Sequence, residues 1–477
     1  MASGRRRFRI VVAVIVAPAG CGTGEGVESP ALPAAQEAFL DTLQERTFGY
    51  FRDLTNPSNG LVPDRWPTRS FSSVAAVGFG LTALPIAVER GWLTRTEAAS
   101  RVRTTLAFLW NAPRSAEPAG VTGHMGFFYH FLDMETGHRY QTVELSTIDT
   151  ALLIAGALVC AEYFTGNDAV ESEIRALADS LYRRIDWTWA QPRPPLVSMG
   201  WTPEQGFHGW DWRGYNEAML LYVLALGSPT HAIDPAAWAE WTSTYVWGEF
   251  HGQTHINFSP LFGHQYSHIW IDFRDIRDSW IRARGIDYFE NARRAVLSQR
   301  AYAIANPMGW QGYGEDAWGL TASDGPVDTT LEIGGQERRF RTYSARGASL
   351  LEIVDDGTLA PTALGGSIPF APELTIATLL RMRERHGEPL FGQYGFLDAF
   401  NMTLTQPIPV QHGRVIEGEG WYDTDYLGID QGPIVAMIEN YRTGLIWRLM
   451  RGNEYIRNGL RRAGFTGGWL DDAEAAR

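Results

Sequence analysis

The feature that most constrains this chain is a repeated alternation between two kinds of helical segment. Residues 72–91 and 146–164 are almost wholly apolar, whereas the segments that follow them, 94–111 and 169–186, place apolar residues every three or four positions. A helix that is apolar on every side has to be buried, and a helix with one apolar stripe can cover it. The alternation therefore predicts a two-layer ring of helical hairpins, an all-α fold of the (α/α)6 barrel type.

Further segments continue the helical pattern: 34–54, 216–227, 234–246, 287–306, 372–387, 430–452 and 453–465. About six hairpins read in this way fill a single domain of residues 35–470, a toroid whose long loops line a central cleft. Residues 325–347 are expected to form a strand pair with Gly334 and Gly335 at its turn.

Residues 1–21 have the layout of a signal peptide. Four arginines precede an apolar run of residues 10–17, and small residues lead to Cys21. The pair of small residues directly before Cys21 favours a lipoprotein signal over ordinary secretion, so that Cys21 becomes a lipidated N-terminus followed by a linker of residues 22–34. We expect an exported protein, periplasmic or in the outer membrane of a bacterium, that reaches the membrane only through this anchor.

Composition narrows the class of substrate. Hydrophobic residues make up 45% of the chain and charged residues 20%, which excludes a disordered chain. The net charge of −13 argues against nucleic acid as a partner. The chain also has 18 Trp, and indole rings stack on the apolar faces of sugars while keeping an N–H free. We therefore expect a neutral glucan or oligosaccharide as substrate, no cofactor, and a monomer.

Two carboxylates stand directly before apolar helical segments, where a toroid would direct them to its cleft. Asp149 abuts a run of Ala and Leu, and its simpler interpretation is a capping residue in a first helical turn. Glu217 opens a segment that otherwise has no charge. Apolar surroundings raise the pKa of a carboxyl, which suits a general acid, although a first-turn Glu favoured by the helix dipole explains the same position.

The segment 417–445, EGEGWYDTDYLGIDQGPIVAMIENYRTGL, combines carboxylates with aromatic rings. Asp423 and Asp425 stand where an EF-hand loop has its first two ligands. Leu427 and Ile434, however, occupy the fifth and twelfth positions, where oxygen ligands are required. The spacing therefore argues against a helix–loop–helix calcium site.

Two interpretations of this segment remain. Asp430, followed closely by Pro433, resembles the N-cap region of a helix with Pro in its first turn. That interpretation does not account for Trp421 and Tyr426, which together with the acids suit the floor of a sugar site.

Histidines cluster at residues 251, 255, 264 and 268, ahead of Asp272. The chain has no HExxH or Cys-His spacing, and neutral imidazoles serve equally well as hydrogen-bond donors to sugar hydroxyls, so we expect no metal. The sequence also lacks GxGxxG after a strand, GxxxxGK[ST] and GxSxG, the motifs of nucleotide-binding proteins and serine hydrolases.

Ordered blocks along the chain closely resemble the glycoamylase-like bacterial proteins, which include the endo-β-1,2-glucanases of glycoside hydrolase family 144. The blocks are GHMGFFYHFLDMETGHR, VELSTIDTALLIAGAL, GWDWRGYNEAMLLYVLALGSP, FGHQYSHIWIDFR, WGLTASDGP, YGFLDAFN and WYDTDYLGIDQGPIVAMIENYRTG. This resemblance implies an (α/α)6 barrel and hydrolysis of β-1,2-glucan to sophorose or sophoro-oligosaccharides with inversion.

The resemblance also implies that Glu217, Asp430 and Asp149 carry the chemistry. We expect the substrate-binding side chains to come from the same blocks: Glu144, Trp210, Trp212, Tyr215, His264, His268, Asp272, Trp421, Tyr422, Asp423, Asp425 and Tyr426. The motifs leave endo or exo action and the exact linkage open.

Two other classes of protein fit the same sequence. A polysaccharide lyase on the same toroid would use His255 or Tyr266 as base and would need an acidic sugar, which the net charge disfavours. A non-catalytic glycan-binding lipoprotein would keep the aromatic residues but would not need all three carboxylates.

Overall fold

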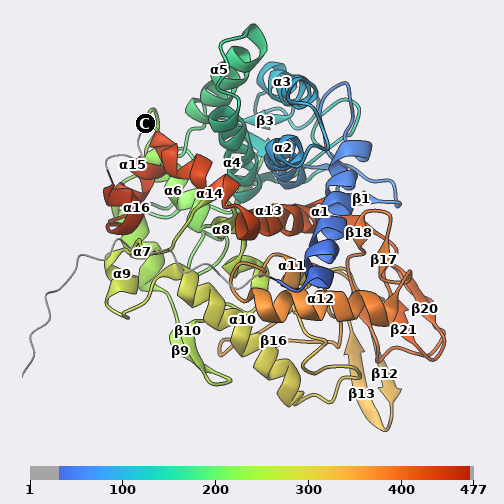
Figure 1. Ribbon diagram of the computed structural model, residues 1–477. Helices are drawn as coiled ribbons and strands as arrows, with labels where there is room; N and C mark the ends of the chain where they lie inside the picture. Colours follow the sequence, from blue (N-terminus) through green and yellow to red (C-terminus); the bar gives the residue numbers. More distant parts are fainter. Residues whose placement is uncertain (1–31, 473–477) are drawn as a thin grey trace, which may run out of the picture.

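The apolar segments form helices that are buried on all sides. A computed structural model describes residues 32–472 of the chain (Figure 1). The buried helices are α2 (Val74–Glu89), α4 (Thr147–Tyr163), α6 (Met219–Gly227), α8 (Tyr266–Trp270), α11 (Pro361–Gly365) and α13 (Gly428–Arg442). Neighbours in this set pack in order, α2 on α4, α4 on α6, α6 on α8 and α8 on α13, and α13 returns to α2. Five of these helices therefore form a closed inner ring, and α11 packs on α13.

The amphipathic segments form an outer layer of helices that bury one face. They are α1 (Ala34–Leu54), α3 (Arg95–Asn111), α5 (Ala169–Arg183), α7 (Ala236–Ser243), α9 (Ser279–Arg282), α10 (Tyr288–Ala305), α12 (Pro372–His386), α14 (Leu445–Gly452), α15 (Glu454–Arg462) and α16 (Gly468–Asp471). Helix α3 begins with a capping box, in which the Thr94 hydroxyl accepts from the Glu97 N–H.

The predicted division into buried and half-buried helices is confirmed, but one pairing differs. We expected α6 to pair with the next helical segment, α7. Instead α15, from near the end of the chain, packs along α6. Every residue of α6 is buried, so this helix needs packing partners on all sides. The apolar face of the amphipathic helix α15 packs on one of them.

The close approach of α2 and α4 depends on two glycines. A Cβ at Gly78 would lie 2.4 Å from the carbonyl oxygen of Leu152, and one at Gly156 would lie 2.1 Å from the carbonyl oxygen of Gly78. Neither helix could keep this spacing with a larger residue at these positions. The contact fixes the start of α4, and with it Asp149, against the start of α2.

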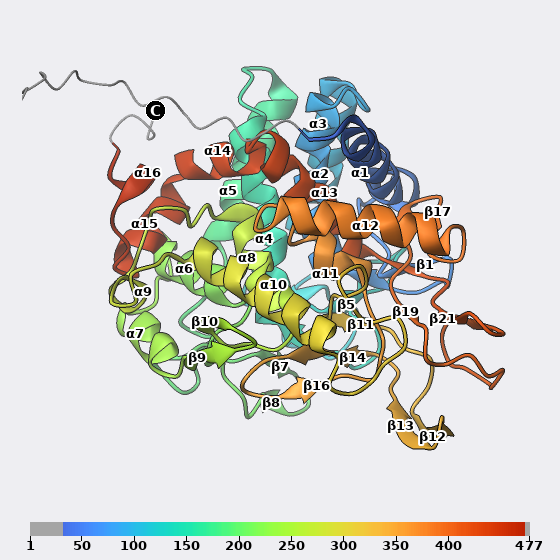
Figure 2. The same cartoon turned by 60° about the horizontal axis from the view of Figure 1, so that its bottom comes forward.

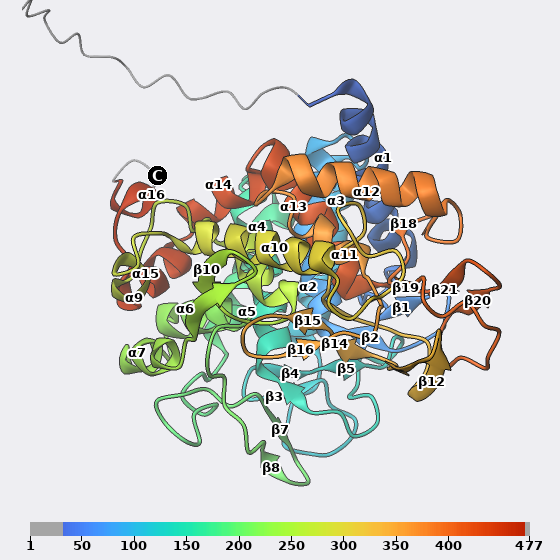
Figure 3. The same cartoon turned by 90° about the horizontal axis from the view of Figure 1, so that it is seen from below.

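Short strands gather at one end of the helical layers (Figures 2 and 3). The largest sheet has the order β3-β4-β6-β7-β8, and its pairs are antiparallel. Its strands are β3 (Gly123–His124), β4 (Phe127–Tyr129), β6 (Leu145–Ser146), β7 (Gly200–Thr202) and β8 (Gly206–Phe207). Strand β6 runs directly into α4, so this sheet positions the first turn of that helix.

The other strands form small antiparallel pairs and one three-stranded sheet, β19-β21-β20. They are β1 (Arg65–Trp66), β2 (Ser72–Ser73), β5 (Phe131–Leu132), β9 (Trp247–Phe250), β10 (Gln253–Ile256), β11 (Ala322–Ser323), β12 (Thr329–Ile333), β13 (Gln336–Phe340), β14 (Ser344–Ala345), β15 (Gly347–Ala348), β16 (Ile353–Val354), β17 (Phe391–Gly392), β18 (Gly395–Phe396), β19 (Phe400–Asn401), β20 (Arg414–Ile416), β21 (Gly420–Tyr422) and β22 (Tyr426–Leu427). The predicted hairpin with its Gly334-Gly335 turn is confirmed as β12 and β13.

Two helix boundaries differ from the sequence prediction. The helix expected from Asp430 begins earlier, at Gly428, so that Asp430 lies in the first turn and Pro433 lies inside α13. The same segment breaks at Gly444, whose φ of 67° ends one helix and begins α14. The signal peptide, Cys21 and most of the predicted linker lie outside the described residues. No helix within residues 32–472 has the length and hydropathy needed to cross a membrane.

Candidate active site

The first turns of the inner helices bring acidic side chains to one place. Asp149 is in the first turn of α4, Asp430 is in the first turn of α13, and Glu217 lies two residues before α6. Tyr266, the first residue of α8, lies among them. Burial raises the pKa of the Tyr266 hydroxyl well above its usual value, and the charges of Asp430, Glu217 and Asp149 add to that rise. The charges of three carboxyls from three helix starts therefore act on one buried tyrosine.

Glu217 is held by its backbone while its carboxyl stays partly open. Ser267 of α8 donates its hydroxyl to the Glu217 carbonyl at 2.9 Å and accepts from the Leu220 N–H at 2.9 Å. Glu217 Oε2 is enclosed and has no hydrogen-bond partner within residues 32–472. Burial raises the pKa of Glu217 to about 7, and the negative charge of Asp149 contributes to the rise. The prediction that Glu217 opens the helix is wrong, because α6 begins at Met219.

Asp149 lies in a capped first helical turn, in which Ser146 is the N-cap residue. The Ser146 hydroxyl accepts from the Asp149 N–H at 3.2 Å and donates to the Asp149 carboxylate, which is the arrangement of a helix cap. The same carboxylate also faces His130, with 3.6 Å between His130 Nε2 and Asp149 Oδ2.

His130 joins Asp149 to Glu144. Its Nδ1 lies 2.8 Å from Glu144 Oε1. Burial opposes the charged imidazole, but the two carboxylates outweigh it and raise the pKa of His130 to about 9. Burial also opposes the ionised form of Glu144, yet the hydrogen bond with His130 holds the pKa of Glu144 below its usual value. The result is a carboxylate–imidazolium–carboxylate chain from Asp149 through His130 to Glu144.

Asp430 contacts a second acid, Asp398, which the sequence analysis did not select. Burial raises the pKa of both carboxyls, and the negative charge of Asp430 adds to the rise at Asp398. The main chain at Asp430 is fixed from α11, since Thr362 Oγ1 donates to the Asp430 carbonyl at 3.0 Å.

Several predicted substrate-binding residues lie in the core, and the structure corrects their assignment. Trp421 is 0% exposed, packs with Phe340 and Leu404, and donates its indole N–H to the carbonyl of His412 at 2.7 Å. Its ring is therefore enclosed by protein and cannot stack on a sugar.

Tyr422 and His268 are corrected for the same reason. The Tyr422 hydroxyl bonds to His386 Nδ1 at 2.8 Å, and its ring stacks on Phe400. His268 packs edge-on against Phe273 and Phe370, and burial lowers its pKa to about 3.

Asp272 is also corrected, because its carboxylate is buried and paired with two arginines. Arg274 donates to it at 2.7 and 2.8 Å, and Arg451 donates to it as well. This pairing holds the pKa of Asp272 below its usual value against the opposing effect of burial. The residue ties α8 to α14 rather than facing a ligand.

The remaining predicted residues divide between supporting and exposed positions. Trp212 is buried and donates its indole N–H to Thr147 Oγ1 at 2.9 Å. Tyr215 and His264 are buried and pack on each other, with 4.8 Å between ring centroids. These three residues therefore support the helix starts behind the site. Trp210, by contrast, is 74% exposed and free to contact a ligand.

Asp423, Asp425 and Tyr426 are buried too. Asp425 accepts from the Thr68 N–H at 2.8 Å, Asp423 accepts from the N–H groups of Thr424 and Asp425, and the Tyr426 ring packs edge-on against Tyr394. The prediction that these side chains contact sugar directly is therefore corrected to a supporting position beside Asp430.

His130, Asp324 and Asp398 were not predicted from the sequence. All three stand inside the blocks that carried the family resemblance, in GHMGFFYHFLDMETGHR, WGLTASDGP and YGFLDAFN. The signal that could have found the acids is a single Asp in an otherwise uncharged block, which is costly to bury without a partner.

Comparison with known proteins agrees with this architecture. The model of the Glycoamylase family, described as "Putative glucoamylase", matches residues 209–454, which is more than half of the chain. The chain belongs to this family.

Members and neighbours of the Glycoamylase family cover nearly the whole chain. A Bacteroides uniformis protein with the same description is 30% identical, with a TM-score of 0.77 over 92% of this chain and 100% of that one. An endo-β-1,2-glucanase from Chitinophaga pinensis, solved with sophorotriose and glucose, is 28% identical, with a TM-score of 0.76 over 92% of this chain and 100% of that one.

A curated relative from Parabacteroides distasonis is an exo β-1,2-glucooligosaccharide sophorohydrolase (non-reducing end). It is 29% identical over 96% of this chain. The chain spans 62% of the length of that relative.

Proposed function

We propose that this protein hydrolyses β-1,2-glucan to sophorose or sophoro-oligosaccharides with inversion. The observation that carries the proposal is that Glu217, Asp430 and Asp149 all lie at or just before the starts of inner helices. Family membership and relatives named for β-1,2-glucans support the choice of substrate.

Glu217 is the proposed general acid. Its raised pKa keeps it protonated near neutral pH, so that it donates a proton to the glycosidic oxygen as the bond breaks. In an inverting reaction a second carboxylate activates water on the opposite face of the sugar. Asp430 takes this role directly, or Asp149 takes it through a water or sugar hydroxyl.

The substrate approaches past Glu144. A groove beside this residue is lined by polar side chains: Thr142, Glu144, Thr202, Glu204, Gln205 and His208. Such side chains offer many hydrogen bonds to sugar hydroxyls, and Trp210 supplies an exposed ring for stacking.

The fold and the cell location belong to the same proposal. We infer that residues 35–470 form one (α/α)6 barrel, and that residues 1–21 direct export and lipidation at Cys21, which leaves a monomeric periplasmic or outer-membrane lipoprotein. Labelling with a fatty-acid analogue tests the anchor. We expect the label in the wild type and not in Cys21→Ser, and equal membrane association of the two would contradict it.

The test of function is incubation with β-1,2-, β-1,3-, β-1,4- and α-1,4-glucans followed by separation of the products. We expect sophorose or its oligomers from the β-1,2-glucan alone. Unsaturated products that absorb ultraviolet light would favour a lyase, and binding without any product would favour a glycan-binding protein.

A further inference from the structure

Three buried carboxylates from separate loops meet beside the candidate active site. Asp324, Asp398 and Asp423 are 0%, 2% and 0% exposed. Each of them offers one oxygen atom within 4.8 Å of an oxygen of the others. Asp324 follows β11, Asp398 precedes β19, and Asp423 follows β21, so the fold assembles the group from distant parts of the sequence.

One oxygen of each carboxylate accepts a hydrogen bond. Asp324 Oδ2 accepts from Arg65 at 2.6 Å, Asp398 Oδ2 accepts from the Asp324 N–H at 2.6 Å, and Asp423 Oδ1 accepts from the Thr424 N–H at 2.6 Å. The second oxygen of each is enclosed and meets no hydrogen-bond donor within residues 32–472. Buried oxygens without donors are rare in folded proteins because they lose water and gain nothing in return.

A fourth enclosed carboxylate oxygen belongs to Asp430, which lies outside the group of Asp324, Asp398 and Asp423. Asp430 is 4% exposed, its carboxyl contacts Asp398, and its Oδ2 also lacks a donor among the described residues. A proton shared between Asp398 and Asp430 relieves one of these oxygens. It leaves the free oxygens of Asp324 and Asp423 unsatisfied.

The nearby positive charges do not balance the group. Arg65 reaches Asp324 but divides its guanidinium among Asp64, Asp324 and Asp425. His412 Nδ1 is 3.8 Å from Asp324. Buried negative charges of this number need a further cation or protons to be stable.

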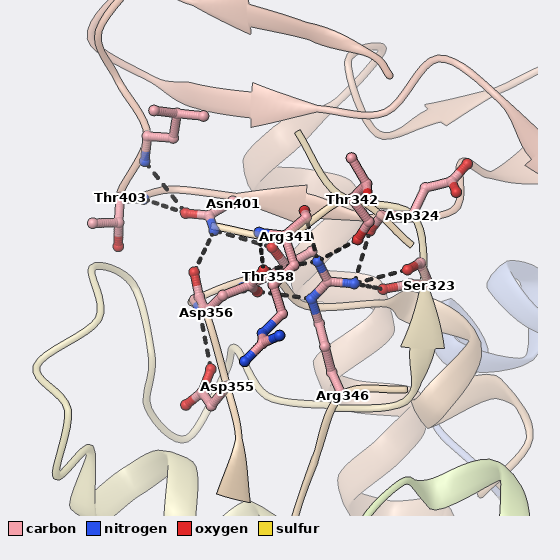
Figure 4. A network of polar contacts seen from close by, with 12 residues as sticks. Ser323, Asp324, Arg341, Thr342, Arg346, Asp355, Asp356, Thr358, Asn401 and Thr403 are labelled. Atoms are coloured by element: carbon pink, nitrogen blue, oxygen red, sulfur yellow. Dashed lines mark hydrogen bonds and ion pairs between the residues drawn. The ribbon is translucent and has the colours of Figure 1, made fainter. Parts of the chain in front are cut away.

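The second guanidinium nearby, that of Arg346, is already paired. It makes a two-pronged ion pair with Asp356, at 2.7 and 2.8 Å (Figure 4). It also donates to the carbonyls of Ser323 and Asp324, at 2.7 and 3.2 Å. Arg346 therefore fixes the main chain of Asp324 without neutralising the carboxylate cluster.

We propose that Asp324, Asp398 and Asp423 bind a divalent cation, with Ca²⁺ preferred. Calcium takes carboxylate oxygens at about 2.4 Å, so two ligand oxygens of one ion lie at most about 4.8 Å apart, which the cluster meets. The donor set is oxygen only, which suits Ca²⁺ or Mg²⁺ rather than Zn²⁺. Calcium also tolerates irregular geometry, and water fills its remaining positions. This ligand set departs from the sequence expectation that the chain binds no metal, and it does not depend on the proposed hydrolysis.

The test uses the mature protein after treatment with a chelator. Isothermal titration with CaCl₂ and with MgCl₂ measures binding, and thermal unfolding measures stability with and without each ion. We expect one Ca²⁺ per chain, a higher Tm with Ca²⁺, and a smaller effect of Mg²⁺. Absence of both a binding heat and a Tm shift with either ion would overturn the proposal and favour neutralisation by protons.

Asp423→Asn provides the sharpest variant. The amide keeps the Oδ1 acceptor for the Thr424 N–H and replaces only the unpartnered oxygen, so folding should persist. We expect Ca²⁺ binding to weaken about ten-fold or more. We also expect the order of the Tm values to reverse: the variant should equal or exceed the wild type in chelator, because it carries one buried charge fewer, and fall below it in Ca²⁺.

Asp355→Asn is the matched control. Asp355 lies beside Asp356 and is not one of the three cluster residues (Figure 4). It accepts from the Gly357 N–H and from the hydroxyls of Tyr302 and Tyr313, and these hydroxyls can rotate to accept from an amide. The Ca²⁺ response should be unchanged in this variant. An undiminished response in Asp423→Asn, or an equal loss in Asp355→Asn, would remove the cluster as the binding site.

Discussion

His130 Nε2 lies 3.6 Å from Asp149 Oδ2 and its Nδ1 binds Glu144, so the imidazole carries its charge in the folded protein at neutral pH. A histidine whose folded pKa is about 9, against about 6.5 when unfolded, contributes stability that is full below pH ~6.5 and is lost as the pH rises through about 9. We predict that the free energy of unfolding, measured with urea between pH 6 and 10, falls across this window more steeply in the wild type than in His130→Gln.

The control is His251→Gln, because the His251 ring packs on Phe250 and Tyr302 rather than on carboxylates. Its pH dependence should match that of the wild type. Parallel curves for the wild type and His130→Gln would show that the two carboxylates do not hold a charged imidazole.

Arg346 and Asp356 form an ion pair in which both side chains are shielded from solvent, with exposures of 0% and 1%. Replacing one partner leaves an uncompensated charge, which typically costs about 3–5 kcal/mol. We predict a loss of that size in the free energy of unfolding for Arg346→Met, with partial recovery in Arg346→Met combined with Asp356→Asn. A loss below about 1 kcal/mol in the single variant would contradict the pairing.

Trp210 and Trp421 should separate substrate binding from stability. Trp421 fills a small core cluster, so Trp421→Ala should lower the free energy of unfolding by about 3–5 kcal/mol. Trp210→Ala should leave stability unchanged, because the ring is exposed, and should raise the KM for β-1,2-glucan. Urea unfolding and steady-state kinetics of the two variants check this, and the reverse assignment of effects would restore Trp421 to the sugar site.

Sequence reasoning found the parts of this fold that have a local signal. Helices α2 and α4 are long enough for their burial pattern to be seen in the chain itself. The inner helices α8 and α11 have only five residues each and were missed, since little more than one turn has no periodicity. The ring could still be predicted without α8 and α11, because the outer helices indicate where the hairpins lie.

The residues of the candidate site also divide into those with a local sequence signal and those without one. Glu217, Asp149 and Asp430 could be selected because each stands at the start of an apolar helical segment. The roles of Asp398 and Asp324 depend on loops that meet only in the folded chain. The sequence around a tryptophan beside acidic residues does not distinguish a buried ring, as in Trp421, from an exposed ring, as in Trp210.

The three catalytic candidates should behave differently from the acid that supports them. Removing a base from a concerted displacement typically costs two or more orders of magnitude in rate. We predict that Asp430→Asn and Asp149→Asn each keep the circular dichroism spectrum and most glycan binding but lose nearly all turnover, whereas Asp423→Asn loses less. A larger loss of turnover in Asp423→Asn than in Asp430→Asn would move the chemistry to the buried cluster.

Turnover of β-1,2-glucan by Glu217→Gln is the most direct test of the whole account. Glu162→Gln is its control, since Glu162 is also half-buried but lies at the end of α4 and binds Asn453. We predict that Glu217→Gln lowers kcat by about a hundred-fold or more with glycan binding and circular dichroism unchanged, while Glu162→Gln keeps kcat. Near-normal kcat in a folded Glu217→Gln variant would contradict Glu217 as the proton donor and, with it, the proposed mechanism.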